Sequence, residues 1–348
     1  MPVTDDNSNN DDYERGLDDV AAFEAPMLSK LASALKNVAV IVSSFIVLAL
    51  LFVVGVQVIW PKPLIESVSL PSYVQNWGYT SDAFVQKISD GTHEIAQNAK
   101  RDFDEAYPRR GIDIEPIEAK IPGSDFTTRS AAQFISESSG LPSRRITGVV
   151  TKAGNMFEVS LRIVGGEHLV TKVTSVNDGV DAEALVKAAS ELAMQLTYPY
   201  VFAASSYNDE KATRPTDFVR TIGILDYMLN TGKDLYYAHN LKCNVFVQLY
   251  KIDLAKKECE EAIKIDPANW PAQANLGYLY YALAQKGFNP VAGGTTAEAK
   301  ENCQKALEQL TKAERSHPLR FLYDGWARCL DVLGNPDEAN KIRLRLNS

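Results

Sequence analysis

The central part of this chain is decided by residues Arg144–Val176, which read RRITGVVTKAGNMFEVSLRIVGGEHLVTKVTSV. Apolar and polar residues alternate from Phe157 to Ile163, which is the period of a strand with one buried face. Gly154-Asn155 and Gly165-Gly166 provide turn residues on either side of this strand. We therefore expect an antiparallel meander of three strands.

A helix is expected directly after the meander, beginning at Asp181. Its apolar residues recur at helical spacing and form one continuous stripe. The stripe comprises Ala182, Leu185, Val186, Ala189, Leu192, Ala193 and Leu196. Because such a stripe must be buried, we expect this helix to pack on the sheet.

Four further elements are expected before the meander. Leu64–Leu70 reads as a short strand, and Thr80-Ser81-Asp82 begins a helix. Ile112–Ile117 alternates isoleucine with acidic residues and predicts a second strand, after which Thr127 or Thr128 begins a short helix. The residues expected to face inward from the two helices are Phe84, Ile88, Ile95, Ala99 and Phe103, then Ala131, Phe134 and Ile135.

This order of elements resembles the N-terminal domain of TolB, and the related domain that precedes tetratricopeptide repeats in many bacterial membrane regulators. Arg145–Val150 matches the strand-glycine-strand phrase with which the meander of that family begins. Gly166-Glu167-His168-Leu169 matches its turn into the last strand. The resemblance covers about 130 residues and implies a small α/β domain.

The last third of the chain is expected to be helical and repetitive. Glu258–Pro267 and Leu276-Gly277 resemble phrases of the tetratricopeptide repeat, and Leu333–Ala339 resembles its phrase between helices. Small residues recur at offsets of 4 and 3 in two places, where helices of a repeat pack closely. They are Ala255, Cys259 and Ala262, then Ala299, Cys303 and Ala306. The resemblance runs from about Asp234 to the end, with an insertion near Gly287–Gly294 and a degenerate leading unit over 203–230.

Val38–Ile59 reads VAVIVSSFIVLALLFVVGVQVI and predicts a transmembrane helix of about 33 Å. Lys30 and Lys36 precede this segment, and Lys62 follows it. This bias favours a cytoplasmic N-terminus and a periplasmic body. A cleaved signal peptide is the alternative, but its apolar region is shorter and ends in small residues, which are absent before Trp60.

Eight acidic residues and one arginine occupy residues 1–24, so we expect a disordered tail there, with a docking motif around Tyr13 or Phe23 as the alternative. The predicted fold class is α+β, with one transmembrane helix, a small α/β domain containing an antiparallel meander and an all-α tetratricopeptide array. The predicted parts are an acidic cytoplasmic tail (1–37), the transmembrane helix (38–60), the TolB-like domain (61–200) and the repeat domain (201–348).

The four cysteines lie in the helical third, at Cys243, Cys259, Cys303 and Cys329. None forms a CxxC pair, so zinc is not expected. Buried free thiols are the preferred interpretation because three of these cysteines take small-residue positions between helices. Two disulfides are the alternative in an oxidising compartment.

Composition argues against nucleic acid as a partner. The net charge is −8 and no clustered run of Lys or Arg is present. Motifs for a nucleophile elbow, a phosphate loop and a dinucleotide fingerprint are missing, and His93-Glu94 lacks the second histidine of a zinc-protease motif. We expect no catalytic residues, no metal, no cofactor and no small-molecule substrate.

A recognition surface is the remaining candidate site. In stacked helical repeats the first helices line a concave groove, where Asn, Tyr and Arg can bind an extended peptide. Asn244 faintly resembles part of the carboxylate clamp of chaperone-binding repeats, whose lysines are absent here. A groove filled by the chain's own insertion or tail is the alternative. The predicted groove residues are Tyr237, Asn240, Asn244, Tyr278, Tyr281, Asp324 and Arg328.

The sequence therefore predicts a non-enzymatic scaffold or assembly factor of the bacterial cell envelope. It is expected to be anchored in the inner membrane by one span and to bind a protein partner through its repeat groove. A transmembrane signalling component that senses a periplasmic partner is the alternative. A hydrolase with an unrecognised site is the third class.

Overall fold

The structure is a computed structural model that describes most of the chain after Pro63. Residues 62–122 and 144–348 belong to one compact unit, and residues 1–61 with 123–143 to a second. The described residues are 36–38, 40–49, 51–52, 63–103, 118–119, 145–153, 156–174, 182–213, 217–268, 270–289, 294–315 and 322–346.

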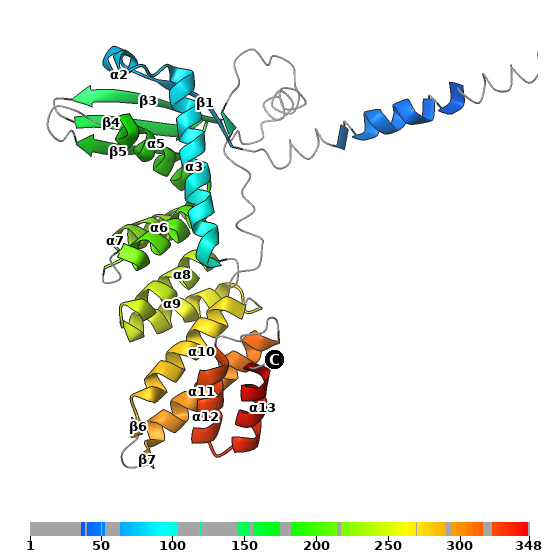
Figure 1. Cartoon of the computed structure of the whole chain (residues 1–348), viewed down its shortest axis with the longest axis vertical. Coiled ribbons are helices and arrows are strands. Elements are labelled where there is room, and N and C mark those ends of the chain that lie inside the picture. The colour runs from blue at the N-terminus through cyan, green and yellow to red at the C-terminus, as the bar shows by residue number, and fades with distance from the viewer. Residues whose placement is uncertain are drawn as a thin grey trace, which may run out of the picture. The chain divides into compact units, whose positions relative to one another are not determined.

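One mixed sheet forms the first part of the larger unit (Figure 1). Its strands are β1 (Leu64–Ser69), β2 (Glu118–Ala119), β3 (Arg145–Ala153), β4 (Met156–Ile163) and β5 (His168–Thr174), in the spatial order β2-β1-β3-β4-β5. β1 runs parallel to β2 and β3, whereas β3, β4 and β5 pair antiparallel. The predicted meander is therefore present.

The register of the meander follows its alternating sequence. Phe157, Val159 and Leu161 on β4 point to the buried face and are at most 2% exposed. Gly148 on β3 pairs with Leu161, and a side chain at Gly148 would collide with the Leu161 methyl group and the backbone. Glycine is therefore required where these two strands meet under the covering helices.

Two long helices cover this face. α3 (Ser81–Phe103) packs on β1, and α5 (Ala182–Thr197) packs on β4 and β5, as their sequences predict. The Thr80 hydroxyl oxygen accepts a hydrogen bond from the Ala83 N–H at 3.1 Å and caps α3. The Ser190 hydroxyl donates to the Ile88 carbonyl at 3.2 Å and joins the two helices. A short helix, α2 (Ser72–Asn76), precedes α3.

In the described part of the chain after α5, eight helices pack as four successive pairs (Figure 1). Within each pair we call the helix that comes earlier in the chain the first helix and its partner the second helix. The pairs are α6 (Pro199–Thr213) with α7 (Val219–Thr231), α8 (Leu235–Gln248) with α9 (Ile252–Ile265), α10 (Trp270–Gln285) with α11 (Ala297–Glu314), and α12 (Tyr323–Val332) with α13 (Pro336–Leu346). Two short strands, β6 (Phe288–Asn289) and β7 (Gly294–Thr295), lie in the predicted insertion between α10 and α11.

Small residues allow the helices of a pair to approach closely. Gly277 on α10 faces Leu310 on α11, and a β-carbon at Gly277 would lie 2.8 Å from two Leu310 side-chain carbons. The predicted small residues of the second helices, Ala255, Cys259, Ala262, Ala299, Cys303 and Ala306, are all at most 1% exposed. Their spacing therefore marks helix contacts, as expected from the sequence.

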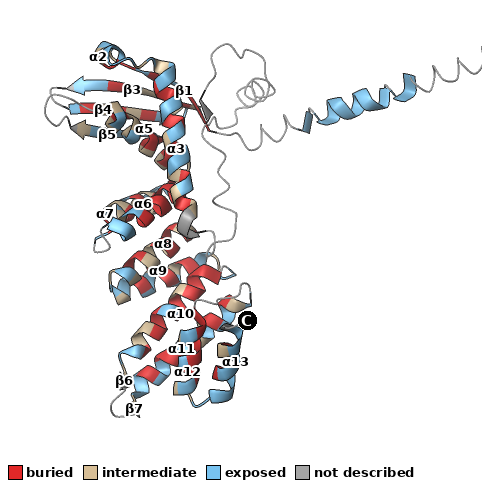
Figure 2. Ribbon diagram, viewed as in Figure 1, coloured by how far each residue is buried: buried red, intermediate tan, exposed pale blue. Residues whose placement is uncertain are grey.

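We call the helices from α6 to α13 the helical array. Its first helix, α6, packs against α3. The Asn98 amide on α3 donates to the Ser205 hydroxyl at 3.0 Å and to Asp209 at 2.8 Å, and the Asn208 amide donates to the Asn98 carbonyl at 2.8 Å. α6 is consequently buried over residues 199–208, which Figure 2 shows in red. Terminal repeats of helical arrays need such a cap, and α3 supplies it.

The four cysteines form two disulfides, so the preferred interpretation as free thiols is wrong. Cys243 of α8 is bonded to Cys259 of α9, and Cys303 of α11 is bonded to Cys329 of α12. The Cα–Cα separations are 5.2 and 5.0 Å. The small-residue positions that suggested inert packing bring the backbones close enough for a bond between cysteines.

The predicted transmembrane helix over residues 38–60 is also wrong. Helix is described there at 36–38, 40–49 and 51–52, and the described part of the chain contains no helix long and apolar enough to cross a membrane. Residues 40–49 rise about 15 Å, half of the roughly 30 Å hydrocarbon core. The fold class with one span is corrected accordingly, as is the single-pass inner-membrane localisation with its cytoplasmic tail and periplasmic body.

Some expectations fall on residues that the structure does not describe. These are the acidic tail over residues 1–24, the strand at Ile112–Ile117, the short helix beginning at Thr127 or Thr128, and the Gly154-Asn155 turn.

Candidate recognition site

The candidate site is built from the first helices α8, α10 and α12. Tyr237, Asn240 and Asn244 follow one another on α8 at spacings of three and four, which place them on one face. Tyr278, Tyr281 and Gln285 repeat the same spacing on α10, with Asn275 three residues earlier. We call Tyr237, Asn240, Asn244, Asn275, Tyr278, Tyr281 and Gln285 the tyrosine–amide strip.

Contacts between neighbouring first helices make the strip continuous from α6 to α10. The ring of Tyr200 on α6 lies 4.8 Å from the ring of Tyr237, centroid to centroid. The Asn275 amide donates to the Asn240 carbonyl oxygen at 3.0 Å. Asn240 has no exposed surface, so this hydrogen bond satisfies a polar group that would be costly to bury alone.

The strip reaches α12 through Tyr281. Its ring packs against Gly325, where a β-carbon would come within 2.8 Å of the ring. The Gln285 amide donates to the Tyr281 hydroxyl at 2.7 Å. Burial raises the pKa of Tyr281, and the nearby Arg328 charge opposes that rise. The phenol therefore stays protonated at neutral pH and can act as a hydrogen-bond donor or acceptor.

An ion pair stands at the α12 end of the strip. The Arg328 guanidinium donates to the Asp324 carboxylate at 2.9 Å, one helical turn away. More than half of each side chain is exposed, so the pair adds little stability. Its two charges nevertheless cancel, so this end of the strip carries no net charge toward a ligand.

The structure brings the predicted groove residues together but exposes them unequally. Tyr278 is 43% exposed, and both members of the Asp324–Arg328 pair are open to solvent. Tyr237 and Asn244 are half-buried, whereas Asn240 and Tyr281 are buried. The last two support the strip from beneath, and Tyr278 offers the largest accessible aromatic surface.

Two residues of the strip were missed by the sequence argument. Asn275 and Gln285 lie three residues before Tyr278 and four after Tyr281. Helical spacing from the predicted tyrosines would have found both.

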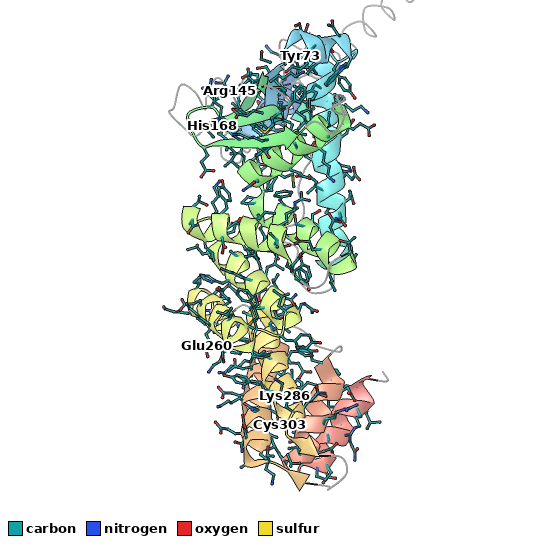
Figure 3. All side chains as sticks on the ribbon, turned by 90° about the vertical axis from the view of Figure 1, so that its left-hand side faces the viewer. Tyr73, Arg145, His168, Glu260, Lys286 and Cys303 are labelled. Atoms are coloured by element: carbon teal, nitrogen blue, oxygen red, sulfur yellow. A yellow bond between two sulfur atoms is a disulfide. The ribbon has the colours of Figure 1, made fainter. Side chains whose placement is uncertain are left out.

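Charge is distributed very differently over the second helices. Half of the 14 residues of α9 are Asp, Glu or Lys, and α11 carries the exposed Lys–Glu pairs Lys305–Glu301 and Lys312–Glu308. Glu260 on α9 is exposed on this charged surface (Figure 3). By contrast, α10 contains no Asp, Glu, Lys or Arg among its 16 residues.

A second polar cluster joins the sheet to the array. Glu167, in the turn before β5, accepts a hydrogen bond from the Tyr227 hydroxyl at 2.7 Å and is in ionic contact with Lys233. The Lys233 ammonium also lies 3.2 Å from the Tyr227 oxygen. Burial tends to raise the pKa of Glu167, but the hydrogen bonds from Lys233 and Tyr227 and the Lys233 charge lower it overall. Burial and the Glu167 carboxylate raise the pKa of Tyr227.

This cluster is a structural joint in which each charged or polar group has a partner. The tyrosine is stabilised in its protonated form, and the lysine is held by the carboxylate, so neither is prepared as a nucleophile. The Gly166–Leu169 segment thus supplies Glu167 to this joint.

Two of the described histidines likewise contact other side chains of this chain. His239 lies 2.6 Å from Glu258, which is also 3.6 Å from Lys242, and His168 on β5 lies 2.6 Å from the Ser160 hydroxyl (Figure 3). Over the described ranges no three His, Cys, Asp or Glu side chains gather in a way that could hold a metal ion.

Comparison with known proteins gives no relative: no protein-family model, no curated protein and no solved structure matches this chain.

Proposed function

We propose that this chain is a non-enzymatic protein-binding scaffold or assembly factor that holds an extended segment of a partner protein on the tyrosine–amide strip. In this proposal the helix pairs are repeats of the tetratricopeptide kind, and the sheet with α3 and α5 is a TolB-like module that caps them. The repeat-like spacing of small residues, buried at Ala255–Ala262 and at Ala299–Ala306, supports the first part.

One observation carries the proposal. The strip lies on the neighbouring first helices α8 and α10, contacts α12 through Tyr281, and presents Tyr278, a large aromatic side chain 43% exposed, beside hydrogen-bonding amides. Tyrosine and amide side chains are typical of protein interfaces, because they combine apolar contact area with hydrogen bonding. The Tyr278 ring also contacts the ring of Tyr281, at 6.5 Å between centroids.

The polar clusters elsewhere favour a role in binding rather than in catalysis. In the Glu167–Tyr227–Lys233 joint and in the His239–Glu258 pair, the polar side chains contact one another. The alternative of a transmembrane signalling component depended on the span over residues 38–60 and is not carried forward.

The test compares two matched double variants of the full chain. Tyr278→Ala with Arg328→Ala removes exposed groups at the strip, and Lys305→Ala with Lys312→Ala removes exposed groups on α11. Both should melt like the parent, because exposed substitutions change the free energy of unfolding by about 0.5 kcal/mol or less. After crosslinking in extracts of the source cells, the strip variant should lose the captured protein and the α11 variant should keep it. Equal capture by both variants would reject the strip as the binding site.

A further inference from the structure

The chemistry of the partner can be inferred from where the array keeps its charges. α10, at the centre of the strip, has no charged side chain. On α8 the two basic residues, His239 and Lys242, make their ionic contacts with the second helices. Lys242 lies 2.7 Å from Asp226 on α7, and both His239 and Lys242 contact Glu258 on α9. The ionic groups of α8 are therefore neutralised on the side of the second helices.

The remaining charges at the strip cancel each other. Asp324 and Arg328 form their ion pair at the α12 end. A charged ligand on the strip would lose water without meeting an opposite charge, which is costly. An uncharged ligand carries no such penalty, so the strip selects against charge.

The amides supply hydrogen bonds of both kinds. A carboxamide has two N–H donors and an acceptor oxygen. Asn275 donates one hydrogen bond to Asn240, and Gln285 donates one to Tyr281. Among the described residues these bonds leave a second N–H and the carbonyl oxygen on the side chains of Asn275 and Gln285. A peptide backbone, which alternates donors and acceptors, matches that pattern.

The spacing of the helices sets the length of the ligand. α8 packs against α10, and α10 against α12. Neighbouring helix axes lie about 8–10 Å apart, so the strip together with the adjoining Asp324–Arg328 pair on α12 spans roughly 20 Å. An extended chain rises about 3.3 Å per residue, and roughly six residues therefore cover the strip.

We propose that the tyrosine–amide strip binds an uncharged, extended peptide segment of about six residues. Asn275 and Gln285 bind its backbone, and Tyr278 packs against one of its side chains. This inference rests on the proposed function and narrows it. Because no charge pair crosses the interface, binding should depend weakly on salt.

The experiment selects a phage-displayed random peptide library on the oxidised full chain and measures synthetic copies of the enriched peptides by fluorescence anisotropy. We expect enriched peptides to share an uncharged core. Their affinity should change less than about twofold between about 50 mM and about 500 mM salt. Tyr278→Ala and Gln285→Glu should each weaken binding by about tenfold. Gln304→Glu, an exposed change of the same chemistry on α11, should leave it unchanged.

The possible failures separate the two proposals. Charged peptides that bind with steep salt dependence, and are lost on Tyr278→Ala, would overturn the inference and keep the proposed function. Peptides that bind all variants equally would overturn both, as would a library without enrichment. Neutral N-acetylglucosamine oligomers are included as a second probe. If these bind in a Tyr278-dependent way while peptides do not, the ligand is a glycan and both proposals are wrong. Melting curves of each variant confirm that it is folded.

Discussion

The first and second helices of the array use the same architecture for opposite purposes. On α9 and α11 many solvent-facing positions hold lysine or glutamate, in ion pairs such as Lys256–Glu260 and Lys312–Glu308. On α10 those positions hold Tyr278 and Gln285. Charged faces keep an array soluble, so the second helices can supply solubility. The first helices are then free to display uncharged groups that are useful for recognition.

The disulfides connect these two kinds of helix. Removing them should cause the largest loss of stability among the proposed changes. Each bond joins a first-helix cysteine to a second-helix cysteine, closing sequence separations of 16 and 26 residues. Loop-closure entropy predicts a loss of about 3 kcal/mol for replacing either pair by alanine, with the Cys303–Cys329 pair costing about 0.4 kcal/mol more. Urea unfolding of the two double variants under non-reducing conditions measures both values. A loss below about 0.5 kcal/mol for either pair would show that its bond contributes little.

The two bonds also differ in which helices they join. Cys259 and Cys303 occupy the same small-residue position of two second helices, between alanines four residues before and three after. Cys259 bonds back to the first helix of its own pair, whereas Cys303 bonds forward to the first helix of the next pair. A partner bound across α10 and α12 should therefore depend on the Cys303–Cys329 bond more than on the other.

Introducing bulk into a first helix is the second test. Gly277→Leu forces a side chain into Leu310 on α11, and overpacking of this kind costs about 1–3 kcal/mol. Gln304→Leu adds the same side chain at an exposed position of α11 and should cost about 0.5 kcal/mol or less. Thermal melts of the two variants compare the positions directly. Equal melting temperatures would mean that α10 and α11 do not pack closely at Gly277.

Features of the fold that depend on residues close together in the sequence could be predicted, and features that depend on residues far apart could not. The meander and the helix beginning at Asp181 were predictable, because alternation and helical stripes are local patterns that burial enforces. The packing role of Cys259 and Cys303 was also predictable from spacing. Their disulfides were not, because pairing depends on which neighbouring helix presents the other cysteine, a contact up to 26 residues away.

The candidate site, too, was predictable only where it depends on local helical spacing. Tyr278 and Arg328 were predictable from helical register, but the burial of Asn240 was not, because it depends on the amide of Asn275 on another helix. The span over 38–60 was inferred from composition alone, and an apolar run does not determine how long its helix is. The Glu167 joint was missed because its three residues come from separate elements.

The Glu167 joint, which links the sheet to the helical array, should make a smaller contribution to stability that depends on pH. Because the pKa of Glu167 is lowered below its ordinary value of 4.5, ionised Glu167 stabilises the folded state above that pH. The contribution is lost as the pH falls through the lowered folded-state pKa. Glu167→Gln should therefore be less stable than the parent at pH 7, and the difference should vanish in acid. The side chain is partly exposed, so the effect should stay below about 1 kcal/mol. This stability difference is measured from the urea unfolding midpoints of both proteins as a function of pH. A difference that does not change with pH would show that the charge of Glu167 does not stabilise the fold.

The smallest effects on stability are expected from Arg328→Ala and Lys312→Ala, which should nevertheless differ in their effect on binding. Arg328→Ala breaks the exposed pair with Asp324 on α12, and Lys312→Ala breaks the exposed pair with Glu308 on α11. Pairs of this kind one helical turn apart contribute about 0.3–0.5 kcal/mol, so both variants should melt within a few degrees of the parent. Their effects on the strip should nevertheless differ. Arg328→Ala leaves Asp324 uncompensated and gives the strip a net negative charge, whereas Lys312→Ala changes only the charged outer surface. Binding of a peptide that carries one lysine should thus gain salt dependence in the first variant, where the lysine can meet the unpaired Asp324 carboxylate, and not in the second. If both variants bind with the parent's salt dependence, the ion pair does not set the charge of the recognition surface, and the contrast between first and second helices would reflect packing alone.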